Sequence, residues 1–301
     1  MNFDSYHNCT LCPRTCHADR RKQAGYCGCT DDLKAARAAL HPWEEPCISG
    51  TAGSGTVFFT GCTLRCCFCQ NYPVSSQGRG KSISVQKLSQ IFLNLQAQGA
   101  HNINLVTPTQ FLPHITAALD LARPRLTLPV LLNSGGYERT ETIDALDGYV
   151  DIYLPDLKYY SPELSLRYSR AADYFEYASR AILRMIEQVG PPVLDEQTGL
   201  MKKGVIIRHM VLPGAKEDSI RLLNWMKEAL PENHFQVSLM SQYTPFYRSS
   251  EYPEINRRIT SYEYYKVVDE AIRLGLTSGF MQEKSSAKEE YTPPFHFEGL
   301  D

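Results

Sequence analysis

Residues 61–71, GCTLRCCFCQN, place Cys62, Cys66 and Cys69 at the spacing C-x3-C-x2-C. A cubane iron–sulfur cluster contains four irons and normally takes four thiolates. Three closely spaced thiolates can therefore hold three irons and leave the fourth open. Because an open coordination position separates catalytic metal sites from closed structural ones, the motif predicts a cluster that binds a further ligand at its free iron.

A zinc knuckle is the alternative use of these three cysteines, completed by Cys67 or by a cysteine nearer the N-terminus. Cys67 directly follows Cys66, so its side chain is expected to point elsewhere and to pack as a small hydrophobic group. The aromatic residues Phe58, Phe59 and Phe68 supply apolar surroundings that limit water, and limited water influences the reduction potential of a cluster.

Strands and helices alternate along the chain on both sides of the cysteine motif. The strands are predicted at 56–60, 102–106, 128–132, 150–154, 204–211 and 235–240, and the helices at 84–98, 115–122, 140–146, 162–189, 216–229 and 260–274. This alternation predicts βαβ units and a parallel sheet, either a full or partial barrel or an open doubly wound sheet. In both architectures the chemistry lies at the C-terminal ends of the strands, and the cysteine motif directly follows the first strand.

Composition narrows the class of protein. The chain has 301 residues, of which 43% are hydrophobic and 21% charged, and its net charge is −2. These values are ordinary for a globular protein and offer no electrostatic argument for nucleic acid or an acidic membrane as partner. The polar N-terminus lacks the apolar core of a signal peptide, and no segment approaches a transmembrane helix in length. We therefore expect a cytoplasmic protein.

The ten cysteines all lie in the first 69 residues, which points to local metal or redox chemistry rather than disulfides. Cys9, Cys12, Cys16 and Cys27, spaced C-x2-C-x3-C-x10-C, suit a structural zinc site or a second iron–sulfur cluster. Residues 1–50 are too poor in apolar groups to fold on burial alone, so metal binding would supply the folding energy of this module. Cys29 is an alternate fourth ligand, and Cys47 either faces the active-site cluster or packs in the interior.

The motif GCTLRCCFCQN, with a glycine before the first cysteine, an aromatic residue before the third and an asparagine two residues after it, resembles the radical S-adenosylmethionine enzymes. The likeness is to the subgroup of pyruvate formate-lyase activating enzymes and covers about residues 51–280. It implies an α/β fold, a partial (β/α)6 TIM-like barrel over 51–281, with the Cys-rich module before it and a tail over 282–301. It also implies that the amino and carboxyl groups of S-adenosylmethionine chelate the open iron of a [4Fe-4S] cluster held by Cys62, Cys66 and Cys69. The reduced cluster would then cleave this cofactor to methionine and a 5′-deoxyadenosyl radical.

Further cofactor contacts follow from the resemblance at the strand ends. The family carries Gly-Gly-Glu after the second strand, to hold the amino group of the cofactor; here Thr107, Thr109 or Gln110 could supply acceptors, without a carboxylate. After the third strand, Asn133 and Ser134 begin a match to the family's Asp-Thr-Asn-Gly, although the glycines that follow also suit an ordinary turn.

The fourth, fifth and sixth strand ends continue the match. Asp156 and Lys158 resemble a family pair beside the cofactor and the substrate; the alternative is a surface ion pair. Arg208 matches an arginine that contacts the cofactor carboxylate, and an arginine in a buried strand needs a partner. Its neighbour His209 is expected in the core or at the rim, and Tyr243 either stacks on adenine or packs in the core.

The N-terminal module departs from the activating enzymes, which lack it, and the whole chain looks like uncharacterised, activase-like radical enzymes of anaerobic prokaryotes. Hydrogen abstraction from a protein glycine, in a glycyl radical enzyme, is therefore one expected reaction. Radical modification of a peptide, nucleoside or small metabolite is the second. The alternative of another class is a non-catalytic electron-transfer or interaction protein. A reductant such as flavodoxin or ferredoxin is the implied partner. Residues 283–291 read as a polar tail, folded across the barrel mouth.

Overall fold

A single curved sheet organises the chain in the computed structural model, which describes residues 1–282 and 293–301. The strands are β1 (Lys34–His41), β2 (Ser54–Phe59), β3 (Lys81–Ser82), β4 (Ile103–Val106), β5 (Val130–Ser134), β6 (Ile152–Pro155), β7 (Val193–Leu194), β8 (Met201–Met210), β9 (Gln236–Met240) and β10 (Gly279–Met281). Their order is β10-β9-β8-β6-β5-β4-β2-β1-β3, with β7 paired to β8. The strands from β2 to β10 along this path are parallel, and the path does not close, as predicted for a partial barrel.

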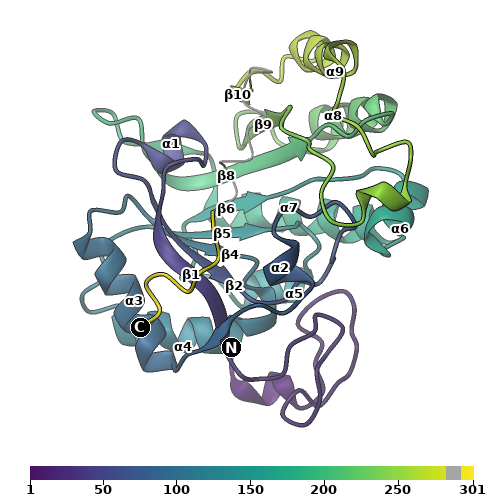
Figure 1. The fold of residues 1–301 in the computed structure, drawn as a ribbon. Helices are drawn as coiled ribbons and strands as arrows, with labels where there is room; N and C mark the ends of the chain where they lie inside the picture. The colour runs from purple at the N-terminus through teal and green to yellow at the C-terminus, as the bar shows by residue number, and fades with distance from the viewer. Residues whose placement is uncertain (283–292) are drawn as a thin grey trace.

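Helices lie between the strands along the chain, and the longer ones cover the outer face of the sheet (Figure 1). They are α1 (Pro46–Ser49), α2 (Tyr72–Ser75), α3 (Val85–Ala97), α4 (Leu112–Ala122), α5 (Thr140–Asp144), α6 (Pro162–Ser169), α7 (Tyr174–Val189), α8 (Lys216–Ala229) and α9 (Ser261–Arg273), with short 3-10 helices at Phe3–Tyr6, Thr109–Phe111 and Ser249–Glu251. Local signals set their ends: Ser84 caps α3 by accepting a hydrogen bond from Lys87 N, and Thr260 and Glu263 form a capping box on α9.

The helix predicted over 162–189 is two helices, α6 and α7. Arg170, after α6, adopts a left-handed backbone with φ 53° and donates its N–H to Leu166 O, a conformation that ends a helix. The apolar periodicity continues on both sides of the break, which explains the prediction of one helix. The C-terminal end of α6 is important for the site, because Ser169, its last residue, contacts the cysteine motif.

Residues 1–50, expected to form one cysteine-rich segment, divide into two parts. Residues 1–33 form loops outside the sheet, in purple in Figure 1. β1 instead joins the sheet, antiparallel to β2. Its Ala-rich sequence, KAARAALH, has weak strand propensity, so this strand depends on tertiary pairing that local pattern does not reveal.

The C-terminal residues also reach β1, since Ala38 N donates to Glu298 O at 2.8 Å and Phe297 N to Ala36 O at 3.2 Å. The polar tail expected at 283–291 lies outside the described residues. Within the described part of the chain, no helix combines the length and the apolar character that a membrane crossing requires.

Candidate active site

The cysteine motif follows β2 and turns across the C-terminal ends of the parallel strands. Gln110 fastens this loop, because its Nε2 donates to Thr60 O at 2.8 Å and to Gly61 O at 3.3 Å. Two sulfurs receive hydroxyl hydrogen bonds: Cys66 Sγ from Ser169 Oγ at 3.0 Å and Cys69 Sγ from Ser75 Oγ at 3.3 Å. Hydrogen bonds to sulfur help to set the potential of a cluster.

The chemistry of the three thiols fits a metal group. Burial, together with the neighbouring Cys66, raises the pKa of Cys62 to about 12 and that of Cys69 to about 11. Both would stay protonated at neutral pH unless a bound cation stabilised their thiolates. Among the described residues, no three His, Cys, Asp or Glu side chains are grouped to hold a single metal ion. A cubane differs from such a site, because each thiolate binds its own iron.

A cavity of about 280 Å³ opens beneath the cysteine loop. Cys62, Cys66 and Cys69 line it on one side. The strand ends supply most of the residues predicted to bind the cofactor, namely Thr107, Asn133, Ser134, Asp156, Lys158, Arg208 and Tyr243. Thr109, also predicted, lies outside this lining. The sequence-predicted residues therefore meet in one place, although they come from six strand ends.

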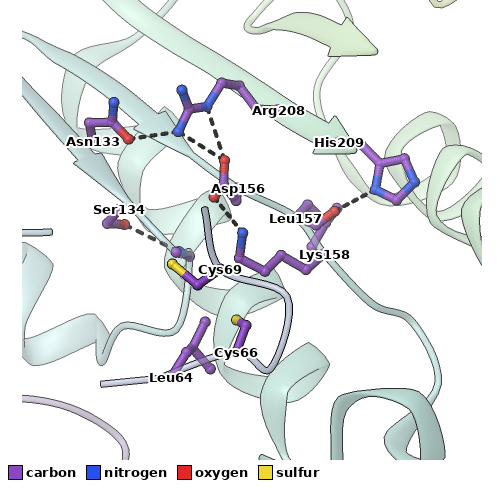
Figure 2. A network of polar contacts seen from close by, with 12 residues as sticks. Leu64, Cys66, Cys69, Asn133, Ser134, Asp156, Leu157, Lys158, Arg208 and His209 are labelled. Carbon is purple, nitrogen blue, oxygen red and sulfur yellow. Dashed lines mark hydrogen bonds and ion pairs between the residues drawn. The ribbon is translucent and has the colours of Figure 1, made fainter. Parts of the chain in front are cut away.

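Arg208 and Asp156 form the centre of a polar network on the cavity wall (Figure 2). Arg208 Nη2 lies 2.9 Å from Asp156 Oδ1 and donates to Asn133 Oδ1 at 2.6 Å, while Lys158 Nζ lies 2.6 Å from Asp156 Oδ2. The Asp156 and Lys158 side chains are only 17% and 20% exposed, so the alternative of a surface ion pair is wrong. Burial opposes ionisation of Asp156, but Arg208 and Lys158 hold its pKa below the usual value.

The loop after β4 lacks the Gly-Gly-Glu motif, but another loop brings a carboxyl group to the same place. Glu138 follows β5, and its Oε1 accepts a hydrogen bond from Thr109 Oγ1 at 2.8 Å. Thr107 has a left-handed backbone, with φ 54°, a conformation that glycine adopts more easily. Glu138 was not predicted, because nothing in the local sequence indicates that this loop reaches the loop after β4.

The ionisation of Glu138 should make folding stability depend on pH. Burial raises the pKa of Glu138 to about 8, with the Thr109 hydrogen bond opposing it, whereas an unfolded chain has a value of about 4.3. Between these values the folded state holds a proton that the unfolded state has lost, so stability falls as pH rises. Glu138→Gln should not lose stability in this way, because glutamine has no carboxyl group to ionise. Its stability relative to wild type should rise by about 2.5 kcal/mol between pH 5.5 and 7.5, because the slope of about 1.4 kcal/mol per pH unit decreases as the pH approaches the folded pKa.

Anaerobic urea unfolding of both proteins at the two pH values measures this difference. Glu228→Gln, on the exposed face of α8, is the matched control and should show no pH-dependent difference from wild type. An unchanged difference between Glu138→Gln and wild type at the two pH values would show that Glu138 ionises normally.

Gly136 allows two strand-end loops to touch. It has φ 77°, and a Cβ at this position would lie 2.1 Å from Asp156 O. The preceding Ser134 Oγ accepts a hydrogen bond from Gly136 N at 3.2 Å. This close approach requires glycine at position 136. An ordinary turn, which the sequence also allowed, would not impose this requirement.

Gly136→Ala should displace Asp156 and destabilise the fold more than a control with the same backbone conformation. Gly148 has φ 73° and open space around its Cβ position. Gly148→Ala should therefore cost only about 1–2 kcal/mol for the left-handed backbone. Gly136→Ala should cost about 1–3 kcal/mol more, because the clash adds to that strain. Chemical denaturation of both variants measures the difference, and equal costs would contradict the close approach.

Several other residues named in the sequence analysis pack in the protein interior. His209 is not among the residues that line the cavity; it bonds Leu157 O at 2.6 Å, as Figure 2 shows, and Ser219 Oγ at 2.8 Å. Burial lowers its pKa to about 4. Cys67 is buried in the main core, as expected for packing, and Cys47 is buried against residues such as Ile152 and Leu154. The Tyr243 hydroxyl donates to Ile255 O at 2.8 Å, so this ring is anchored in the core while also lining the cavity.

The N-terminal loops brace the cysteine motif directly. Arg14 Nε donates to Thr63 O at 2.9 Å, Cys62 N to Cys27 O at 3.4 Å, and Cys29 Sγ lies 3.2 Å from Thr60 O. These contacts join residues up to 49 positions apart in the chain. The N-terminal segment therefore helps to position the loop that carries Cys62, Cys66 and Cys69.

Two glutamates, the buried Glu45 and Glu44 with a side chain 10% exposed, line the same cavity and were not predicted as site residues. Glu44 contacts Asn104, Asn133 and Arg208, which come from three different strands. The sequence contained one indication of their role, namely two adjacent acidic residues followed by Pro46. This segment was instead assigned to the cysteine-rich module.

Comparisons with known proteins agree with this geometry. The Radical SAM superfamily model matches residues 56–226. "Uncharacterized protein MJ0674" of Methanocaldococcus jannaschii is 30% identical over 282 residues, covering 90% of this chain and 76% of that protein. A radical SAM methyltransferase structure from Sphaerobacter thermophilus matches at 14% identity with a TM-score of 0.53, covering 76% of this chain and 66% of that one. Streptococcus suis SuiB bound to S-adenosylmethionine matches at 13% identity with a TM-score of 0.50, covering 76% and 50%. The chain spans half to two thirds of these solved proteins, and the likeness to them concerns the fold.

Proposed function

Because this chain belongs to the radical SAM superfamily, we propose that Cys62, Cys66 and Cys69 hold a [4Fe-4S] cluster and that S-adenosylmethionine binds in the cavity beneath them. When bound and reduced, the cluster supplies the electron that cleaves S-adenosylmethionine to methionine and a 5′-deoxyadenosyl radical, which abstracts hydrogen from a substrate. One observation carries the proposal: the three buried thiols share a single cavity with the polar network of Asp156, Lys158 and Arg208.

The residues of the cavity have separable roles in this proposal. Arg208 orients the carboxylate of the cofactor by charge, while Asn133 and Asp156 hold the guanidinium in place. Thr107 and Ser134 offer acceptors for the amino group beside the cysteine loop. The ring of Tyr243, fixed by its hydroxyl bond to Ile255 O, offers an apolar surface to the adenine. Phe68, packed edge-on against Tyr243 at 5.7 Å between ring centres, helps to exclude water.

For the substrate, we propose a glycine of a partner protein, from which the radical abstracts hydrogen as in activating enzymes. A peptide, nucleoside or small metabolite is the second candidate substrate. The motif spacing and the strand-end residues support the likeness to activating enzymes. An external reductant such as flavodoxin or ferredoxin would supply the electron. A glycyl-radical signal in electron paramagnetic resonance, after adding each large protein encoded beside this one, separates the two substrate classes.

The N-terminal cysteines are proposed to hold a second metal centre, with Cys29 as the alternate ligand. An iron–sulfur cluster gives each thiolate its own iron, whereas zinc would require the described thiols to move closer together. The Arg20 guanidinium, which lies among these cysteines, supports this proposal. Arg20 is fully buried, and its hydrogen bonds in the described residues go to the carbonyls of Cys29, Gln110 and Thr30, with Cys9 Sγ 4.0 Å away. No carboxylate is among these partners. A buried charge needs compensation, which metal-bound thiolates would supply.

Metal analysis tests this second centre. Cys12→Ala should remove one zinc, or about four irons, per chain relative to the wild-type protein, whereas Cys67→Ala should keep the full content. Equal metal content in wild type and Cys12→Ala would rule the N-terminal centre out.

The main proposal is tested by anaerobic reconstitution with iron and sulfide, followed by reduction in the presence of S-adenosylmethionine. We expect methionine and 5′-deoxyadenosine in equal amounts. Iron-loaded, reduced protein that forms neither product would overturn the proposal and favour a non-catalytic electron-transfer or interaction protein.

A further inference from the structure

The cavity has an acidic floor, formed by residues 43–46, where Glu44 accepts a hydrogen bond from Asn104, two residues before the end of β4. α1 follows this floor, and its Ile48 packs in one cluster with Leu131, Ile152 and Ile206. Leu131 faces the barrel interior, because alternate residues of a strand share a face and Asn133, two positions on, lines the cavity. α1 therefore plugs the barrel beneath the cavity, and Figure 1 shows it beside the starting end of β8.

Hydrogen bonds hold the floor in one conformation. Glu45 O accepts from Ile48 N at 2.8 Å and from Ser49 N at 3.0 Å, and Glu44 N donates to Ser49 Oγ at 2.9 Å. Asn102 Nδ2 donates to Ile48 O at 2.8 Å, which ties α1 to the sheet. The two carboxylates are thus presented on a rigid base, as a binding site requires.

The two carboxylates differ in their partners. Glu44 is fully engaged: Arg208 lies 3.2 Å from its Oε2, while Asn104 and Asn133 donate to its Oε1 at 3.1 and 3.3 Å. Glu45 is only 8% exposed, and its side chain accepts a hydrogen bond from the Ser238 hydroxyl. Its Oε2 has no hydrogen-bond partner among the described residues. A buried carboxylate oxygen without a donor is costly, so this atom is positioned for a partner that enters the cavity.

The charges around the cavity identify that partner. Among the described lining residues, the carboxylates are Glu44, Glu45 and Asp156, whereas the cations are Lys158 and Arg208. Asp156 takes both cations and Glu44 shares Arg208, which leaves Glu45 without a direct ion pair. His41 also lines the cavity, but burial lowers its pKa to about 4, so it is neutral.

We propose that Glu45 binds a cationic nitrogen group of the substrate, a guanidinium or an ammonium. This inference rests on the proposed function and names the substrate class of the same cavity. A group bound at Glu45 would hold the substrate between the floor and the cysteine loop. Both candidate sources, a free amine or guanidine and a basic side chain of a peptide, share this chemistry.

Calorimetric binding to the reconstituted protein with S-adenosylmethionine tests the inference, since it needs no turnover. The probes are agmatine, the blocked peptide N-acetyl-Ala-Arg-Ala-amide, and N-acetyl-Ala-citrulline-Ala-amide as its neutral isostere, because a free N-terminus would carry an ammonium of its own. We expect at least one cationic probe to bind wild type tighter than the citrulline peptide. Glu45→Gln should weaken that probe by about 10- to 100-fold, the range for a hydrogen bond to a charged group. The relative affinity of agmatine and the arginine peptide then identifies the source.

Glu228→Gln removes the same charge from an exposed helix face and should leave probe binding unchanged. Equal binding of the arginine and citrulline peptides, or equal cation binding by wild type and Glu45→Gln, would overturn the inference. So would a Glu45→Gln variant that loses affinity for S-adenosylmethionine alone, because the carboxylate would then serve the cofactor. Failure of the proposed function is distinct: wild type would form no 5′-deoxyadenosine, whatever the probes show.

Discussion

Cys66→Ala is expected to reduce 5′-deoxyadenosine formation to the level seen without protein, while Cys67→Ala retains it. Cys66 lines the cavity and its sulfur accepts a hydrogen bond from Ser169 Oγ. Cys67 is its immediate neighbour, yet its side chain is buried in the core. The pair thus separates loss of a cluster ligand from loss of a buried sulfur at the same place in the chain.

The magnitudes make this comparison decisive. Even outer partners of metal ligands cost about 10- to 100-fold when lost, so removing a ligand should cost roughly 100-fold or more. Cys67→Ala removes one buried sulfur, which should cost about 1 kcal/mol of stability. Iron content and product yield, measured on the same anaerobic preparations, check both values. Similar losses in the two variants would show that buried volume at this loop, rather than a specific ligand, decides activity.

Arg208→Met should be among the most destabilising single changes in the barrel. It leaves Glu44 without its cation and removes one of the two cations on Asp156. Breaking a buried ion pair on one side costs about 3–5 kcal/mol, because the remaining charge stays buried. Methionine keeps most of the side-chain length, so the loss reports on charge more than on packing.

An exposed pair of the same type provides the control for Arg208. Arg167 and Glu254 have side chains that are 51% and 40% exposed, and exposed pairs contribute at most about 1 kcal/mol. Arg167→Met should therefore shift the urea midpoint much less than Arg208→Met. Adding Glu44→Gln to Arg208→Met should recover part of the loss, since it removes the stranded charge. Equal shifts for Arg208→Met and Arg167→Met would show that the network is solvated.

The alternating strands and helices were predictable because the parallel strands are short apolar runs buried on both faces. Residues that line the cavity were predictable where they lie near a strand end: Asn133 is close to the end of β5, Arg208 to the end of β8, and Asp156 directly follows β6. β1 was missed because alanine carries little strand preference, and because part of its backbone pairing is with Phe297 and Glu298, which are distant in sequence. The break after α6 was missed because a left-handed arginine leaves no mark in the apolar pattern.

Glu44, Glu45 and Glu138 were missed for a different reason. Each is brought to the cavity or its rim by a segment that crosses to another part of the fold, so its role depends on contacts that no local spacing encodes. Glu44 meets strands β4, β5 and β8, and Glu138 meets Thr109 after β4. For Glu44 and Glu45 the adjacent pair of acids before Pro46 was the one feature visible in the sequence, whereas Glu138 had none.

The central claim is that Cys62, Cys66 and Cys69 leave one iron open for S-adenosylmethionine. Electron–nuclear double resonance of the reduced, reconstituted protein tests it directly, with the cofactor labelled by ¹⁵N in its amino group. The account predicts a hyperfine coupling between the reduced cluster and that nitrogen in wild type and Cys67→Ala, and its loss in Cys66→Ala. A reduced-cluster signal in wild type without any ¹⁵N coupling would contradict the account.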